Sequence, residues 1–193
     1  MAQTSTTILS SKSHKADITV TEGASFTAST KTIATTSTSL ANLAQFDVIS
    51  ITGTTNNNQS FTVKSVATDG LSIVVEETVT DESSDGSTDT VIDHVGFVTD
   101  KQKGDGYYSQ TDGVHTVAYQ FDTSVNAETS IRMQGTLATT PTEDDWFDIS
   151  NTSPTPDQST TIYSYNFTGN FVWVRAKITG MTAGSITSIL LNS

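Results

Sequence analysis

The segment 81–89 carries residues suited to binding a hard cation. Its oxygen-bearing and turn-forming residues follow at short spacing: Asp81, Ser83, Asp85, Gly86 and Asp89. This order matches the start of an EF-hand loop, in which such oxygens converge on calcium after a glycine turn. Ile92, however, stands where the closing glutamate belongs, and no helical pattern flanks the segment. We therefore interpret it as a solvated acidic loop, with a calcium site as the alternative.

A second acidic group lies beside aromatic residues. Its members are consecutive or nearly so: Glu143, Asp144, Asp145, Trp146, Phe147 and Asp148. Paired carboxylates beside aromatic rings suggest a glycosidase or a sugar-binding edge. Glycoside hydrolysis, however, needs two carboxyl groups held across a cleft, and consecutive residues in a turn do not supply that geometry. We expect the acids to face water while Trp146, Phe147 and Ile149 enter or flank the core.

No other residues form a recognisable reactive group. His14, His94 and His115 are isolated and the chain has no cysteine, so no zinc-binding spacing and no disulfide framework exist. The many serines lack a nucleophile elbow, and no phosphate loop or dinucleotide fingerprint occurs. The sequence therefore predicts a protein that is not an enzyme and that uses no cofactor or metal.

Charge narrows the range of partners. The formal net charge is −12 with only nine Lys and Arg, so no basic stripe could neutralise a phosphate backbone. We expect no nucleic acid partner and no binding to anionic membranes. No run of eighteen apolar residues occurs, and the first residues lack the pattern of a secretory signal. The sequence therefore predicts no membrane span and, if the protein works outside a cell, release without a classical signal, for example inside a particle set free by lysis.

Composition predicts an all-β fold. Ser and Thr make up about a third of the chain, and both compete with helical hydrogen bonding, while Thr suits a half-exposed pleated surface. Alternating segments between turn signals predict strands in the first half: 18–21, 47–52, 61–66, 71–76 and 90–98. They describe a small β-barrel or meander. The segment 39–46 is the one helical candidate, because Leu40, Leu43 and Phe46 recur at helical spacing after a Ser cap.

Changes in amino-acid composition and hydrophobic periodicity along the chain predict four regions. Residues 1–16 are polar and without period, and we expect an N-terminal arm that Ile8 and Leu9 anchor to a partner. Residues 17–99 form the small β-barrel module. Residues 100–106 are charged and rich in glycine, which is typical of a linker. Residues 107–193 form the second domain.

The second domain has longer strands and more aromatic residues. Strands are expected over 114–121, 129–137, 146–149, 160–167, 170–179 and 185–191, with all three prolines between them. This pattern predicts an antiparallel β-sandwich of jelly-roll type. In 170–179, one face carries small apolar residues and suits the core. The other face carries Phe171, Trp173, Arg175 and Lys177, and we expect it to be an exposed aromatic and cationic partner-binding face.

Both halves resemble parts of tailed-bacteriophage structural proteins. The segments that carry this resemblance are 39–58, 61–66 and 73–77 in the first half and 131–137, 145–149 and 171–178 in the second. The first half resembles a small β module of virion proteins, although Phe46 stands where that module often has glycine. The second resembles the β-sandwich domains of accessory head and tail proteins. The resemblance implies a non-catalytic virion component.

These observations lead to one main expectation and one alternative. The main expectation is a capsid decoration or stabilising protein, located in the virion, that binds other virion proteins and copies of itself as a homotrimer. The partner-binding residues are expected to be Ile8, Leu9, Phe171, Trp173 and Arg175. The alternative is a tail or fibre component, including a glycan-binding adhesin domain that uses the face of Phe171 and Trp173.

Overall fold

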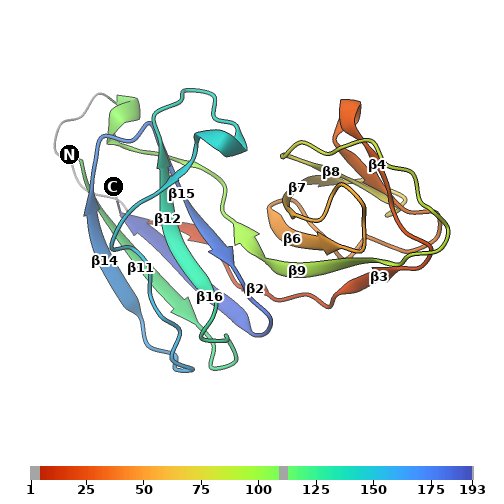
Figure 1. Cartoon of the computed structure of the whole chain (residues 1–193). Helices are drawn as coiled ribbons and strands as arrows, with labels where there is room; N and C mark the ends of the chain where they lie inside the picture. Colours follow the sequence, from red (N-terminus) through yellow and green to blue (C-terminus); the bar gives the residue numbers. More distant parts are fainter. Residues whose placement is uncertain (1–4, 109–112, 193) are drawn as a thin grey trace. The chain divides into compact units, whose positions relative to one another are not determined.

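The computed structural model describes residues 5–108 and 113–192 and shows an all-β protein (Figure 1). Strands and three short 3-10 turns account for the regular structure, and the described residues contain no α-helix. No helix in this part of the chain is therefore long or apolar enough to cross a membrane. The chain divides into two compact units: 15–97, here called the inserted unit, and 1–14 with 98–193, here called the discontinuous unit.

The discontinuous unit contains two antiparallel sheets. Its strands are β1 (Ser5–Leu9), β2 (Lys12–Ser13), β10 (Gln102–Lys103), β11 (Val114–Phe121), β12 (Ser130–Thr136), β13 (Phe147–Asp148), β14 (Tyr163–Thr168), β15 (Trp173–Thr179) and β16 (Ser185–Asn192). One sheet has the order β1-β16-β11-β14, with β2 also on β16, and the other includes β13-β12-β15, with β10 on β15. Buried side chains from both sheets form its core, including Val117, Tyr119, Ile131, Met133 and Ile178. The expected β-sandwich is confirmed.

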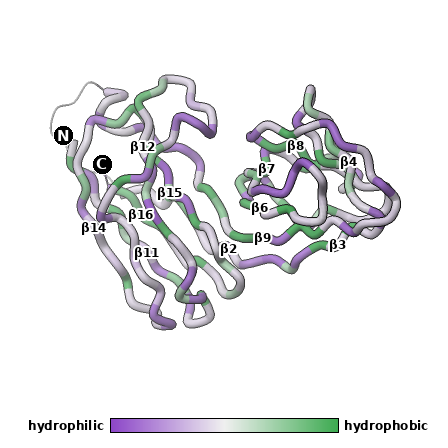
Figure 2. Tube along the Cα trace, in the orientation of Figure 1, coloured by the Kyte–Doolittle hydropathy of each residue, from purple (hydrophilic) through white to green (hydrophobic). Residues whose placement is uncertain are grey.

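The inserted unit is a curved antiparallel sheet. Its strands are β3 (Ile18–Val20), β4 (Ser25–Thr27), β5 (Thr32–Ala34), β6 (Asp47–Thr52), β7 (Ser60–Val66), β8 (Ser72–Val75) and β9 (Thr90–Val98). The pairing runs β3-β9-β6-β7-β8-β5-β4. Strands that follow one another in the chain lie side by side over β6-β7-β8, so the expected meander forms there. Within the described residues β4 and β3 do not pair with each other, so no closed barrel forms. Its core includes Phe61, Ile49 and Ile73, and along the strands of both units hydrophobic stretches alternate with hydrophilic ones (Figure 2).

The N-terminal segment is part of a sheet rather than a free arm. β1 pairs antiparallel with β16, and β2 pairs with the beginning of the same strand. Ile8 and Leu9 are buried in the discontinuous unit. The expectation of a free arm is therefore wrong, because the surface that covers Ile8 and Leu9 belongs to the same unit. Their role in binding a partner stays a prediction.

The segment 100–106 is likewise packed and not a linker. β10 within it pairs with β15, and the amides of Gly104 and Gly106 donate to the carbonyls of Val172 and Phe171 at 3.0 and 2.9 Å. A Cβ on Gly104 would lie 2.4 Å from the Phe171 carbonyl oxygen. Glycine is therefore needed here for close backbone contact, and not for the flexibility that its presence suggests in a sequence.

The expected helix over 39–46 is absent. Two successive turns replace it, closed by bonds from the Leu43 amide to the Leu40 carbonyl and from the Asp47 amide to the Ala44 carbonyl. Leu40 and Leu43 are buried in the core as the spacing suggested. Phe46 adopts a left-handed φ of 73°, which ends any helical path.

A buried charged cluster joins the beginning and the end of the inserted unit. The Lys15 ammonium lies 2.6 Å from Asp47, whose carboxylate is fully buried, and His94 Nε2 lies 3.8 Å from the same carboxylate. The amide of Lys15 donates to His94 Nδ1 at 3.3 Å, and the amide of Ala44 donates to Asp47 at 2.8 Å. Burial opposes the charge of Asp47, but the bonds from His94, Lys15 and Ala44 outweigh it and lower the pKa of Asp47.

Replacing Asp47 with Asn tests this cluster. The change leaves Lys15 without its buried counter-charge, so we expect the free energy of unfolding to fall by about 3 kcal/mol at pH 7. Because the pKa of Asp47 is lower in the folded chain, its contribution is present above the ordinary carboxyl pKa and is lost as pH falls through the lowered value. In urea unfolding, the difference between the native protein and Asp47→Asn should therefore shrink below about pH 4.

Asp69→Asn is the matched control for this experiment. Asp69 accepts a bond from the Leu71 amide at 3.0 Å, which asparagine can also accept, so its effect should stay within about 0.5 kcal/mol. A difference for Asp47→Asn that remained constant down to pH 3 would contradict the lowered pKa.

Candidate binding surface

Strand β15 supplies the face that the sequence singled out. Val174, Ala176 and Ile178 point into the core, as the alternation predicts. The residues on the other side have very different environments from those expected. Of Phe171, Trp173 and Arg175, only Trp173 is more than marginally exposed.

Phe171 is a packing residue. It is buried, and a Cβ on either Gly135 or Gly169 would lie within 2.6 Å of its ring. The rings of Phe147, Phe167 and His115 lie around it, with centroids 5.9 to 6.2 Å away. The expected exposure of Phe171 is wrong, because the two glycines let neighbouring backbone cover its ring. Its partner-binding role stays a prediction.

Arg175 is also covered by its own chain. Only 5% of the residue is exposed, and its guanidinium donates to both oxygens of Glu143 at 2.6 and 2.7 Å. Nε donates to Gln134 at 3.0 Å, and the guanidinium carbon lies 4.2 Å from the centre of the Trp146 ring. The expected exposure of Arg175 is wrong as well, since its guanidinium is paired with Glu143 and Gln134 of the same chain. Its partner-binding role stays a prediction.

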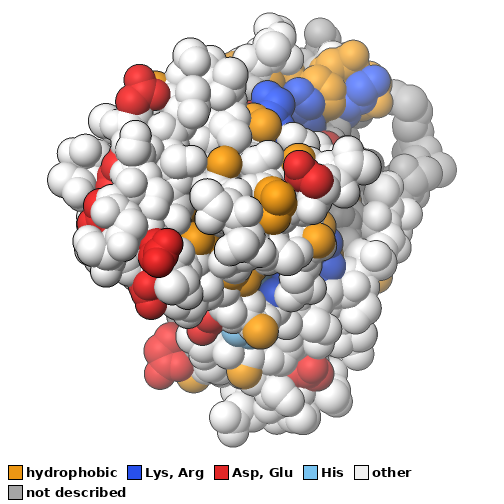
Figure 3. Space-filling view, turned by 90° about the vertical axis from the view of Figure 1, so that its right-hand side faces the viewer, with side chains coloured by type: hydrophobic (Ala, Val, Ile, Leu, Met, Phe, Trp, Pro, Cys, Tyr) orange, Lys and Arg blue, Asp and Glu red, His pale blue; other side chains and the backbone are white. Residues whose placement is uncertain are grey.

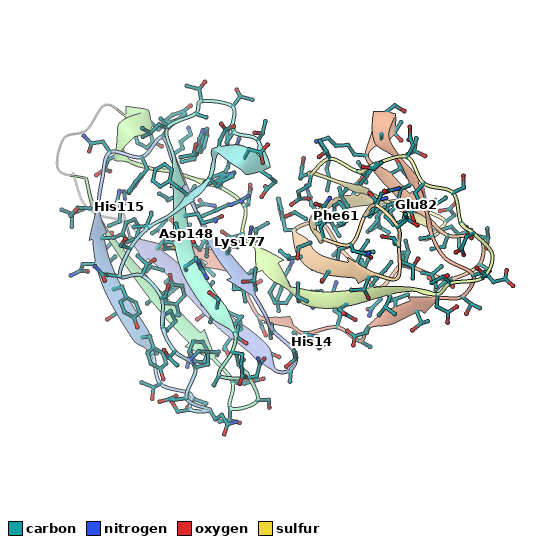
Figure 4. The ribbon with its side chains drawn as sticks, viewed as in Figure 1. His14, Phe61, Glu82, His115, Asp148 and Lys177 are labelled. Atoms are coloured by element: carbon teal, nitrogen blue, oxygen red, sulfur yellow. The ribbon has the colours of Figure 1, made fainter. Side chains whose placement is uncertain are left out.

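The polar network continues over the same sheet. Gln134 lies opposite Arg175 in register and donates to Asp148 at 2.9 Å, and Arg132 forms an ion pair with Asp148. Asp148 and Lys177 lie on this sheet (Figure 4). Burial raises the pKa of Asp148, but bonds from Gln134 and Arg132 and the charge of Lys177 lower it overall. Asp148 and Glu143 are therefore each held by a cation, and not arranged as an acid and base pair across a cleft.

The exposed aromatic and cationic surface lies beside β15, on β10 and the residues next to it. It comprises Lys101, Lys103, Tyr107, Tyr108 and Trp173, here called the lysine-tyrosine platform. The Lys101 ammonium lies 4.6 Å from the centre of the Trp173 ring, and the Lys103 ammonium lies 4.2 Å from that of Tyr107. Tyr107 contacts both Trp173 and Tyr108, with centroids 5.0 and 5.2 Å apart.

Regular structure fixes the position of the platform. β10 places Lys103 opposite Trp173, and the 3-10 turn η2 (Asp105–Tyr108) carries both tyrosines directly after the two close-packed glycines. The Trp173 indole donates to the Thr139 carbonyl at 3.1 Å. Lys101, Lys103, Tyr107 and Tyr108 lie in or next to the segment 100–106, whose charge and glycine content predicted a linker and no binding residues. The Lys-x-Lys spacing was the available signal, because in an extended segment it places two cations on one side.

A hollow of about 370 Å³ lies beside the platform. Its lining residues are Thr6, Lys101, Gln102, Lys103, Tyr108, Trp173 and Leu191. Tyr107 and Tyr108 are 44% and 56% exposed, so the ring surface next to the hollow is open to solvent. A site with cations, aromatic rings and polar groups around one depression can bind a small anionic ligand.

The acidic loop uses its carboxylates as local caps. Asp81 accepts from the Ala28 amide at 2.6 Å, Asp85 from the amides of Ser87 and Thr88 at 2.8 Å, and Asp89 from the Glu22 amide at 3.2 Å. The hydrogen bonds from the amides of Ser87 and Thr88 lower the pKa of Asp85 to about 2. The acids therefore hold separate turns, and among the described residues no three acidic or histidine side chains gather as a metal site.

None of the three histidines is part of the platform. His94 belongs to the buried cluster with Asp47, and His115 is buried against Phe167 with its Nε2 3.3 Å from the Gly169 carbonyl. The backbone amide of His14 donates to the Gly184 carbonyl at 2.9 Å. Each of the three lies in a different environment, as their isolation in the sequence suggested.

The geometry defines a two-unit antiparallel β protein with a cationic and aromatic surface site. Comparison with protein-family models and with curated proteins finds no match. The chain is similar to the K1 cleaved adhesin domain of Lys-gingipain from Porphyromonas gingivalis W83, with 11% identity and a TM-score of 0.35 over 92% of this chain and 98% of that one. It is also similar to the K2 cleaved adhesin domain of Lys-gingipain, with 10% identity and a TM-score of 0.30 over 58% and 73%. Likenesses of this size carry no conclusion about function.

Replacing Glu143 with Gln tests the network beneath this face. The buried Arg175 guanidinium loses its counter-charge, and we expect the free energy of unfolding to fall by about 2 kcal/mol. Asp144→Asn removes an exposed neighbouring charge and should change it by less than about 0.5 kcal/mol. Equal effects of the two substitutions in urea unfolding would show that the ion pair contributes nothing specific.

Proposed function

We propose that the protein is a non-catalytic structural component of a bacteriophage particle, acting as a capsid decoration protein. The resemblance of both halves to virion β modules supports this role. The ion pairs of the discontinuous unit support it too. Glu143 and Asp148 are held by Arg175 and by Arg132, so these carboxylates stabilise the fold. Such a protein acts through its surfaces.

One open sheet edge carries the proposal. β14 ends the order β1-β16-β11-β14 and, within the described residues, pairs only with β11. The strand is six residues long and contains no lysine or proline, the residues that usually protect a sheet edge. Ser164, Asn166 and Thr168 on it are exposed, and Ile162 just before it is 62% exposed. A strand from another copy or from a capsid protein can extend the sheet here.

An open sheet edge such as β14 favours an assembly in which each copy buries its edge against a neighbouring copy. A strand added to β14 satisfies backbone groups that otherwise meet only water, so copies gain stability by burying the edge against a neighbour. The net charge of −12 disfavours random association, and contact therefore depends on a specific surface. We propose a homotrimer on the particle, in which β14 forms the contact with a neighbouring chain.

Introducing lysine into the edge tests the proposal. Ser164→Lys with Thr168→Lys places two charges on β14 without touching the core, and we expect loss of the trimer and at least tenfold weaker binding to capsids lacking the protein. Light scattering after size exclusion reports the oligomer, and co-sedimentation with the capsids reports binding.

Ser65→Lys with Thr68→Lys adds the same charge at exposed positions away from β14 and should leave both readouts unchanged. Native protein that stays monomeric and does not bind the capsids would refute the structural role. If both double variants behaved alike, the role would stand but the β14 contact would not.

A further inference from the structure

The lysine-tyrosine platform holds two lysines for which the described part of the chain provides no carboxylate partner. Among the described residues, Lys15, Lys64, Arg132 and Arg175 form ion pairs with carboxylates, whereas Lys101 and Lys103 form none. Both are exposed, two residues apart. Basic and hydrophobic side chains gather at the upper right of the face in Figure 3. In a chain of net charge −12, this makes the platform a local site for an anion.

Aromatic rings give the platform a second property. Tyr107 and Tyr108 meet edge to face with an angle of 75° between their rings, and Tyr107 also contacts Trp173. Rings held at an angle present more than one flat apolar surface next to the ammonium groups. Flat rings favour a ligand that has both a flat apolar face and polar groups at its rim.

The hollow adds a size limit and hydrogen-bonding groups. Its volume of about 370 Å³ lies in the range of small-ligand sites, about 300 to 1,000 Å³. Thr6 and Gln102 line it together with both lysines, so a hydroxyl and an amide are available beside the charges. A small ring with hydroxyl groups and a carboxylate matches all of these features.

We propose that the platform is a binding site for an acidic saccharide of the uronic acid type. A sugar ring stacks on Tyr108, its carboxylate lies between the ammonium groups of Lys101 and Lys103, and its hydroxyls bond to Gln102 and Thr6. This inference goes beyond the structural role, since the site and β14 use different residues. An acidic peptide could satisfy the lysines, but it offers no saturated ring for the exposed tyrosine surface.

Calorimetry with trigalacturonic acid tests the proposal. We expect saturable binding that weakens as salt rises, and at least tenfold weaker binding of maltotriose, a neutral trisaccharide. Tyr108→Ala removes the stacking surface and Lys103→Met removes one charge while keeping the side-chain stem. Each should raise the Kd about tenfold.

Matched variants separate the site from general effects. Tyr108→Phe keeps the ring and should bind like the native protein, and Lys64→Met removes an exposed lysine elsewhere and should not change the Kd. Triglutamate should not bind. Absence of trigalacturonate binding at about 10 mM, or equal binding of triglutamate, would overturn the proposal. Because the capsid assay does not use this sugar, either proposal can fail without the other.

Discussion

Pairing between distant segments is the constraint on which the structure depends. β1 at the beginning of the chain pairs with β16 at its end, and β3 pairs with β9 where the inserted unit begins and ends. A chain rich in Ser and Thr gains little from helical propensity, so its buried backbone groups must find partners on other strands. The discontinuous unit is therefore complete only when both ends of the sequence are present. The inserted unit can be accommodated as one continuous insertion between β2 and β10, because its first and last strands, β3 and β9, pair with each other.

The same constraint positions the surface site. β10 is only two residues long, yet its bonds to β15 and the close contact of Gly104 with Phe171 fix the segment that carries Tyr107 and Tyr108. Beside it, the ion pair between Arg175 and Glu143 secures the η3 turn (Glu143–Asp145) to β15. Buried charges thus stabilise the support, and the exposed lysines remain available for a ligand. Preorganised side chains lose less conformational entropy when they bind.

Local patterns predicted the strands well but not their partners. Alternation in 170–179 correctly predicted the core side of β15, because every second side chain faces the same way. It could not predict that Arg175 is buried, since Glu143 and Trp146, which cover it, come from a distant turn. Glycine content made 100–106 resemble a linker, because the sequence does not show whether glycine serves flexibility or close contact. Helical spacing in 39–46 predicted burial of the leucines but not the turns, which the left-handed Phe46 requires.

The distribution of charge gives the two proposed surfaces different roles. The acidic side chains of 81–89 cap turns and leave their negative charge facing solvent, which opposes contact between copies except where backbone pairing compensates, as we propose for β14. The lysine-tyrosine platform has the opposite sign and carries ring surface in place of unpaired backbone. Strand addition requires an extended chain, whereas the hollow beside Tyr108 admits a compact anion. Under the two proposals, a chain attached to a particle through the β14 edge keeps the platform free for a second ligand, because the two surfaces share no residue.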